Sequence, residues 1–217
     1  TRKPRRENVK TADFRRRTSR ALHKKRAYGI IGTMLRFTEN NEVIRDDAYR
    51  AILVGLQTSE DISYSMEELK GLAEAANVEV LGQMILDDDQ EAITGAVLEF
   101  IRQGADMVLC TGGMSVDPDD KTPGAIKATG AEIVSYGAPV LPGAMFLLSY
   151  YEKEGKQIPV LGLPGCVMYA GRTIFDLVLP RVLAGEVLQK EDLAAYGEGG
   201  LCLGCEVCHF PNCGFGK

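Results

Sequence analysis

The residues best suited to chemistry follow an apolar run near the middle of the chain, in the stretch LCTGGMSVDPDD at positions 109–120. Its two adjacent glycines let backbone N–H groups approach an anion closely, as phosphate-binding loops require. Three carboxylates that suit a divalent cation, an amine or a hydroxyl group follow at Asp117, Asp119 and Asp120. Because glycine and aspartate are also ordinary turn residues, the spacing alone fits either a ligand-binding loop or a plain turn.

A second candidate site lies near residue 217, where four of the 6 cysteines follow one another as C-x2-C-x2-C-x4-C. Successive C-x2-C spacings let thiolates converge on one centre, so an iron–sulfur cluster, a zinc ion and a tail without metal all remain open. The Gly-rich stretch YGEGG (196–200) predicts a linker that detaches this Cys-rich, metal-binding tail (197–217). The candidate ligands are Cys202, Cys205, Cys208 and Cys213, and His209 lies between them.

Short aliphatic runs alternate with helical periodicity from residue 51 onward, which indicates βαβ units. A parallel sheet with helices on both faces follows, so the predicted fold class is α/β, a three-layer αβα domain with a mostly parallel sheet. Ser65 and Glu68 form a candidate capping box, and Asp89 precedes a helix with an acidic start. The expected strands are 51–56, 78–86, 105–110, 131–137 and 158–165, and the expected helices are 65–77, 90–104 and 170–186.

Ligands of open α/β sheets bind beyond the carboxyl ends of the strands, and the glycine–aspartate stretch starts there. The stretch LGLPGC (161–166) repeats the arrangement, because a buried strand again ends in a turn, here Pro-Gly. We therefore expect two such turns at one sheet edge to line one pocket.

Charge is distributed unevenly along the chain. Residues 1–26 contain 12 Lys and Arg against 2 Asp and Glu, which leaves 13 against 28 for residues 27–217. The acidic part does not resemble a nucleic-acid binder, whereas a basic arm over residues 1–45 could contact RNA, resemble an organellar transit segment or be a solvated, mobile tail. No apolar run is long enough to span a membrane, and six cysteines without a visible signal peptide favour reduced thiols and a cytoplasmic location.

Three motifs in this order, TGGMSVDPDDKTPGAI, APVLPGAM and PVLGLPGCVMYA, resemble the molybdopterin-binding domain of the molybdenum-cofactor biosynthesis family, of the MogA, MoeA and gephyrin type. The resemblance covers residues 78–186 and implies the molybdopterin-binding domain fold for residues 46–190. It implies molybdopterin or the molybdenum cofactor as ligand, Mg²⁺, ATP or molybdate as further ligands, and a possible homo-oligomer.

The resemblance also assigns site residues by position. It places Asp120, with Asp119 beside it, at the family's essential aspartate, as the candidate catalytic residues. The implied pterin-binding residues are Thr111, Gly112, Gly113, Ser115, Thr122, Pro142, Gly143, Pro164, Gly165 and Cys166.

The departures from that family concern both the site and the first strand. Ala144-Met145 and Cys166-Val167 stand where many members carry polar or proline residues, which supports binding better than catalysis. The thiol of Cys166 could touch a dithiolene or a metal, although a small buried residue is the commoner use of cysteine. Residues 50–83 resemble the N-terminal domain of HflX-type GTPases instead, which suggests a fusion near EVLGQ, but no G-x-x-x-x-G-K-[ST] motif is present.

Three functions remain open on this basis. The first is an enzyme of the adenylyl- or molybdenum-transferase type, which activates the pterin or inserts molybdate. The second is a non-catalytic molybdopterin carrier or sensor with an iron–sulfur or zinc centre at the C-terminus. The third is a ribosome- or RNA-associated module that depends on residues 1–83, and salt-sensitive RNA binding would identify it.

Overall fold

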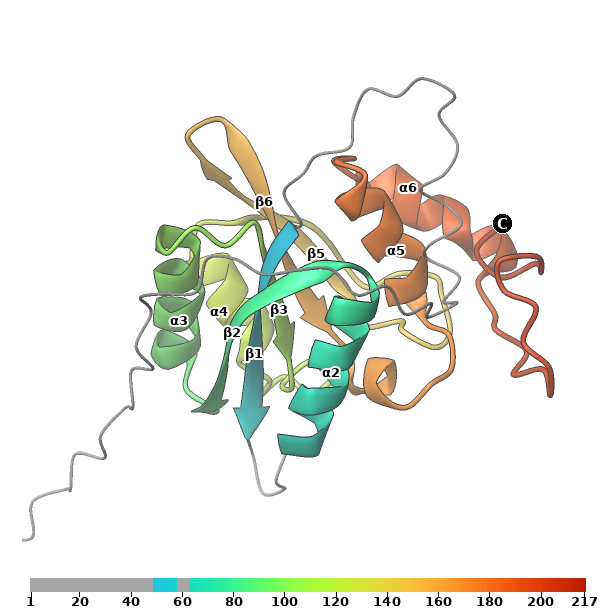
Figure 1. Ribbon diagram of the computed structural model, residues 1–217, viewed down its shortest axis with the longest axis horizontal. Coiled ribbons are helices and arrows are strands. Elements are labelled where there is room, and N and C mark those ends of the chain that lie inside the picture. The colour runs from blue at the N-terminus through green and yellow to red at the C-terminus, as the bar shows by residue number, and fades with distance from the viewer. Residues whose placement is uncertain (1–48, 58–62) are drawn as a thin grey trace, which may run out of the picture.

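The structure is a computed structural model that describes residues 49–57 and 63–217 (Figure 1). The predicted basic arm, residues 1–45, lies outside the described residues. The strands are β1 (Tyr49–Gln57), β2 (Val78–Asp87), β3 (Met107–Thr111), β4 (Glu132–Tyr136), β5 (Leu147–Lys153) and β6 (Lys156–Leu163). The helices are α2 (Ser63–Ala75), α3 (Gln90–Arg102), α4 (Thr122–Ala128), α5 (Ile174–Leu183) and α6 (Lys190–Ala195), with 3-10 turns η1 (Gly165–Met168) and η2 (Tyr196–Gly199).

The strands form one six-stranded sheet in the order β2-β1-β3-β6-β5-β4. The pairs of β1 with β2, β1 with β3 and β3 with β6 are parallel, whereas β5 runs antiparallel to both of its neighbours. A tight turn joins β5 to β6 through Glu154 and Gly155, which both have positive φ, as the turn of a two-residue hairpin requires. The mostly parallel sheet of the predicted α/β class is therefore confirmed.

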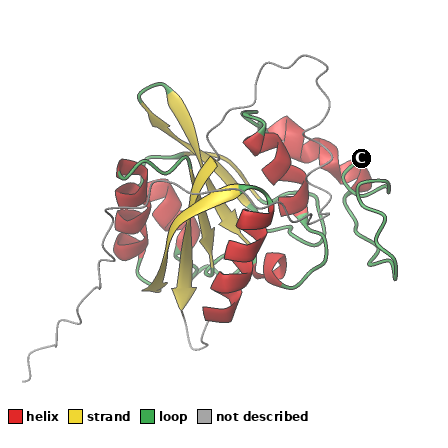
Figure 2. Cartoon of the chain, in the orientation of Figure 1, coloured by secondary structure: helices red, strands yellow, loops and turns green. Residues whose placement is uncertain are grey.

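Helices cover both faces of the sheet, because the central strands are apolar on both sides (Figure 2). In β1, Ala51 and Leu53 face the core formed with α2 and α5, whereas Ile52 and Val54 face the core formed with α3. Phe146, just before β5, is fully buried in the first of these cores. The domain is thus the expected three-layer arrangement.

The starts of α3 and α5 follow local capping chemistry, and the first of them lies at the expected position. The Asp89 carboxylate accepts a 2.8 Å hydrogen bond from the Ala92 N–H at the start of α3. Thr173 caps α5 and forms a reciprocal capping box with Asp176. The predicted capping box at Ser65 is wrong, because α2 already begins at Ser63 and Ser65 lies within its first turn.

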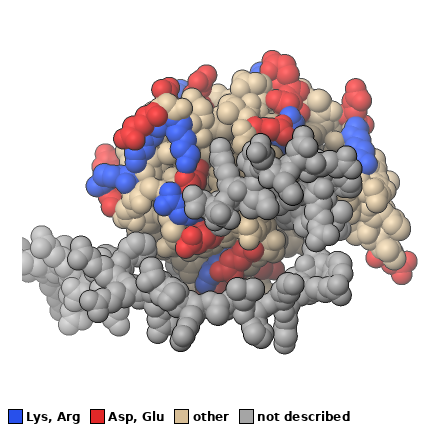
Figure 3. Space-filling view, turned by 45° about the horizontal axis from the view of Figure 1, so that its top comes forward, with Lys and Arg blue, Asp and Glu red and all other residues tan. Residues whose placement is uncertain are grey.

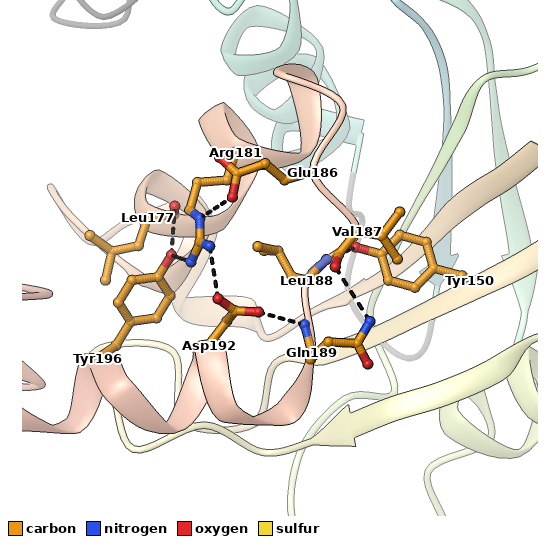
Figure 4. Close-up of polar contacts among 9 residues, drawn as sticks. All are labelled: Tyr150, Leu177, Arg181, Glu186, Val187, Leu188, Gln189, Asp192 and Tyr196. Atoms are coloured by element: carbon orange, nitrogen blue, oxygen red, sulfur yellow. Dashed lines mark hydrogen bonds and ion pairs between the residues drawn. The ribbon is translucent and has the colours of Figure 1, made fainter.

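A cluster of polar contacts joins α5 to α6 (Figure 4). The Arg181 guanidinium donates from Nε to Glu186 Oε2 and from Nη2 to Asp192 Oδ1, both at 2.8 Å. Its Nη1 also lies 3.2 Å from the Tyr196 hydroxyl oxygen. These contacts hold α6 and η2 against α5, so the chain after α5 is a packed part of the domain.

Acidic and basic side chains are interspersed over the described surface that Figure 3 shows. At the amino edge of the sheet, Asp106 binds Arg50 Nε at 2.8 Å and also contacts Lys156 Nζ. Burial raises the pKa of the Asp106 carboxyl, but the two cations outweigh it and hold that pKa below its usual value. Among the described residues, no helix is long and apolar enough to cross a membrane.

Candidate functional site

Three loops meet at the carboxyl edge of the sheet because of how their strands pair. Thr111, the last residue of β3, pairs with Leu163, the last residue of β6, so the loops that follow both strands start at the same level. Strand β5 runs the opposite way, and its first residue Leu147 pairs with Gly162 near the end of β6. The turn before β5 therefore returns to this same edge, which is the arrangement expected of a ligand site in such a sheet.

The glycines of the first loop lie against the end of β1. Gly112 and Gly113 have φ values of 87° and 54°, and a Cβ atom on either would lie 2.9 Å from a side-chain atom of Leu56. Both positions therefore need glycine for conformation and for close packing alike. The fold alone accounts for these glycines, whether or not a ligand approaches their backbone.

Ser115 and Asp120 close the loop upon itself. The Asp120 Oδ2 atom accepts a hydrogen bond from the Ser115 hydroxyl at 2.8 Å and another from the Ser115 backbone N–H. Both bonds use the same carboxylate oxygen, and among the described residues Oδ1 of Asp120 has no hydrogen-bond partner. The carboxylate thus shapes the loop with one oxygen and leaves the other available to a ligand.

The remaining aspartates and Tyr136 support this loop. Asp117 Oδ1 accepts a 3.0 Å bond from the N–H of Asp119, and both side chains are exposed. The Tyr136 hydroxyl, at the end of β4, donates to the Ser115 carbonyl at 2.8 Å. Burial and the nearby negative charge of Asp120 raise the pKa of the Tyr136 phenol. Tyr136 was not among the expected site residues, because nothing in the sequence shows that β4 ends beside this loop.

Both threonines among the expected binding residues are buried within the fold. The Thr122 side chain is fully buried and donates a 2.8 Å hydrogen bond to the Gly112 carbonyl. Thr111 is 6% exposed within β3. The N-cap position of α4 is occupied by Lys121, whose side chain makes no capping hydrogen bond. Asp120 therefore does not cap this helix. The two threonines support the loop from beneath.

The two proline–glycine turns lie next to each other. Gly143 is buried, has a φ of 116°, and would place a Cβ 2.5 Å from Ile174 Cγ2 at the start of α5. Burial raises the pKa of the Cys166 thiol, and the backbone N–H groups of Cys166 and Gly143 offset only part of this rise. Pro164 is buried, whereas Gly165 is exposed and has open space around its Cα. Because Leu147 of β5 pairs with Gly162 of β6, both turns lie at the same edge of the sheet.

The C-terminal tail packs beside these turns instead of being detached. Leu141 donates a 2.6 Å backbone bond to Gly200 and accepts a 2.8 Å bond from the N–H of Cys202. Phe215 is 5% exposed in the main core. The expectation of a detaching linker at 196–200 is wrong, since Gly199 and Gly200 permit close contacts in which a Cβ atom would overlap neighbouring backbone.

The four tail cysteines line one cavity of about 360 Å³ together with His209 and Pro142. Within residues 49–57 and 63–217, however, no three His, Cys, Asp or Glu side chains are arranged to hold a metal ion. All six cysteines are free thiols. The structure brings the tail thiols to a common cavity without converging them on one point.

Comparison with known proteins relates this chain to one family. A search of curated proteins gave no match. Among solved structures, a tungsten cofactor synthesizing protein, MoaB, from Pyrococcus furiosus is 18% identical with a TM-score of 0.51, and the alignment covers 64% of this chain and 96% of that one. A molybdopterin biosynthesis protein from Mycobacterium abscessus is 15% identical with a TM-score of 0.47, over 63% and 92% of the two chains. The first likeness supports the fold.

The family described as "Probable molybdopterin binding domain" matches residues 57–184, which is more than half of the chain. The matched segment includes all three loops at the carboxyl edge and ends at Ala184, directly after α5. The chain therefore belongs to the molybdopterin-binding domain family of molybdenum-cofactor biosynthesis proteins.

Proposed function

We propose that this protein binds molybdopterin or the molybdenum cofactor at the carboxyl edge of its sheet and acts in molybdenum-cofactor biosynthesis. The observation that carries the proposal is the meeting of three loops at this edge, in a chain that belongs to the family. The free thiols of the chain fit a reducing compartment, and we propose the cytoplasm.

The three loops would contact different parts of the pterin. The backbone around Gly112 and Gly113, fixed against Leu56, would face the anionic phosphate of the pterin. The turns at Pro142–Gly143 and Pro164–Gly165 would enclose the ring system from the β5 and β6 side. Because the loops are held by internal hydrogen bonds, little conformational entropy is lost when the ligand binds.

Asp120 fits a magnesium ion through its second carboxylate oxygen. A carboxylate next to a bound phosphate would repel it unless a cation lies between the two groups. Mg²⁺ takes few protein carboxylates and fills its other positions with phosphate oxygens and water. We propose that Oδ1 of Asp120, with Asp119 nearby, holds this ion, which would supply charge neutralisation for the transfer of a group from ATP or of molybdate to the pterin.

A non-catalytic carrier is the second candidate, and Cys166 favours it. A thiol stands where polar contacts are common in the family, and burial raises the pKa of this thiol. Such a site would retain a sulfur-rich ligand without turning it over. Pterin-dependent nucleotide consumption identifies the enzyme, and pterin binding without turnover identifies the carrier.

The binding site can be tested by blocking it without disturbing the fold. A Cβ atom on Gly165 would meet nothing within 4 Å, so Gly165→Leu should fold normally while its side chain fills the space beside the turn. Gly95 on α3 is equally open, so Gly95→Leu is the matched control away from the site. Molybdopterin affinity should fall by about tenfold or more, roughly 1.4 kcal/mol, in Gly165→Leu only. Equal affinities in the two variants, both with native melting temperatures, would show that the pterin binds elsewhere.

A further inference from the structure

The cavity beside the Pro142 turn is lined by thiols and aromatic rings that the proposed pterin site does not use. Four thiols reach it from the tail, and the aromatic rings of Phe210 and Phe215 form part of its wall. Those rings meet edge to face, with centroids 6.1 Å apart. A cavity with apolar walls and several thiols suits a thiophilic metal centre better than a polar small molecule.

The two ends of the tail are fixed, but its middle is not. Cys202 is bonded to Leu141, and the Gly216 N–H donates to the Gly199 carbonyl at 2.7 Å. Among the described residues, the segment 203–208 makes no backbone hydrogen bond, and Leu203 and Val207 are 79% and 65% exposed. A ligand that cross-links this segment could therefore draw it inward without breaking backbone hydrogen bonds.

Arg172 lines the same cavity, and its Nη1 is already engaged, 3.7 Å from Asp176 Oδ1 and bonded at 2.6 Å to the Gly171 carbonyl. Its guanidinium carbon lies 5.4 Å from the centre of the Phe210 ring, and its Nε is buried without a hydrogen-bond partner. A buried N–H group without a partner is costly, and an anionic acceptor in the cavity would remove that cost. A metal centre carried by thiolates is such an acceptor, because its sulfur atoms carry negative charge.

We propose that Cys202, Cys205, Cys208 and Cys213 bind a metal centre in this cavity, next to the pterin-binding turn. On binding, each thiol releases its proton to solvent and its sulfur forms a bond to the metal. The thiols do not yet converge, so the metal would draw the unsupported segment 203–208 inward, as in small domains that fold around their metal. The shared chemistry is a set of four thiolates, which suits either a zinc ion or an iron–sulfur cluster.

The cavity lies next to the proposed pterin site. Pro142 lines the cavity and also belongs to the proline–glycine turn before β5, at the carboxyl edge of the sheet. A metal centre here would stiffen one wall of the pterin site. The metal site itself depends on neither pterin binding nor turnover. Its test can therefore fail or succeed independently of the proposed function.

The test uses the full chain, purified anaerobically and reconstituted in separate arms with zinc(II) and with iron(III), sulfide and a thiol reductant. The decisive variant is Cys205→Ser combined with Cys208→Ser, because both residues are exposed and serine there costs no packing. Cys166→Ser is the matched control, since it removes a partly buried thiol outside the tail. Bound metal is measured by elemental analysis, and the cluster also by its visible absorption.

The wild type and the Cys166 variant should retain about one zinc or about four irons per chain, whereas the double variant should lose most of it. Retention of zinc alone or of iron with sulfide identifies which centre the thiols hold. Circular dichroism of the metal-free proteins separates loss of ligands from loss of fold. A wild type that retains neither metal, or a folded double variant that retains as much as the wild type, would overturn the proposal.

Discussion

Replacing Asp120 with asparagine separates the two uses of its carboxylate. Both hydrogen bonds from Ser115 go to Oδ2, so the amide oxygen of Asp120→Asn can take over that role. The NH₂ group then replaces Oδ1, the oxygen proposed to hold magnesium. The substitution therefore keeps the shape of the loop and removes its charge.

The expected magnitudes of the two effects differ enough to be told apart. Hydrogen bonds to a charged group become bonds to a neutral amide, which should lower the free energy of unfolding by about 1 kcal/mol. Loss of a carboxylate that stabilises the transition state through magnesium should lower turnover on the order of a hundredfold, equivalent to about 2.7 kcal/mol. Pterin affinity without magnesium should change little, because the glycine loop and the proline turns remain.

The assay measures pterin-dependent nucleotide consumption, and pterin binding by calorimetry, against magnesium concentration. Asp117→Asn is the matched control, because it removes an equal charge from an exposed position in the same loop. Magnesium dependence should disappear in the Asp120 variant and survive in the Asp117 variant. Unchanged magnesium dependence in Asp120→Asn would refute the role of Oδ1 and leave Asp120 as a loop-shaping residue only.

Two further predictions concern the scaffold around the site. Asp106→Asn should lower the free energy of unfolding by about 1 kcal/mol at neutral pH, because it removes the charge that Arg50 and Lys156 bind. Since the pKa of this carboxyl is lowered in the folded protein, its stabilisation is complete above its unfolded value of about 4 and is lost as the pH falls further. Denaturant melts of both proteins at several pH values should therefore converge in acid, and a constant difference would contradict the ion-pair account. Phe215→Ala should cost about 3 kcal/mol in a urea melt, because the ring is buried in the main core, whereas no change would mean a tail independent of the domain.

The central part of the fold could be predicted because its sequence signals are local. Strands β1 and β3 are unbroken apolar runs buried on both faces, and α3 follows an aspartate that caps it. Strand β5 was missed, because its apolar run continues from a proline–glycine turn and ends in charged residues. The order of the strands depends on packing between distant segments, which no local pattern encodes.

In the candidate site, too, short motifs could be recognised from the sequence, whereas contacts between distant segments could not. The glycine loop and both proline turns were recognisable as motifs, and the sheet brings them to one edge. That Thr122 would be buried beneath Gly112 could not be predicted, because it depends on where α4 begins. The stretch YGEGG was misread as a flexible linker, since a glycine needed for close packing and one needed for flexibility look alike in a sequence.

The most direct test of the proposed function is an anaerobic titration of the purified full chain with molybdopterin, alone and with Mg-ATP or molybdate. We predict saturable binding to the pterin alone, which Gly165→Leu weakens and which magnesium strengthens through Asp120. Turnover in the presence of one co-substrate would identify the reaction, and binding without turnover would identify the carrier. Absence of saturable molybdopterin binding by the folded wild-type protein would contradict the account.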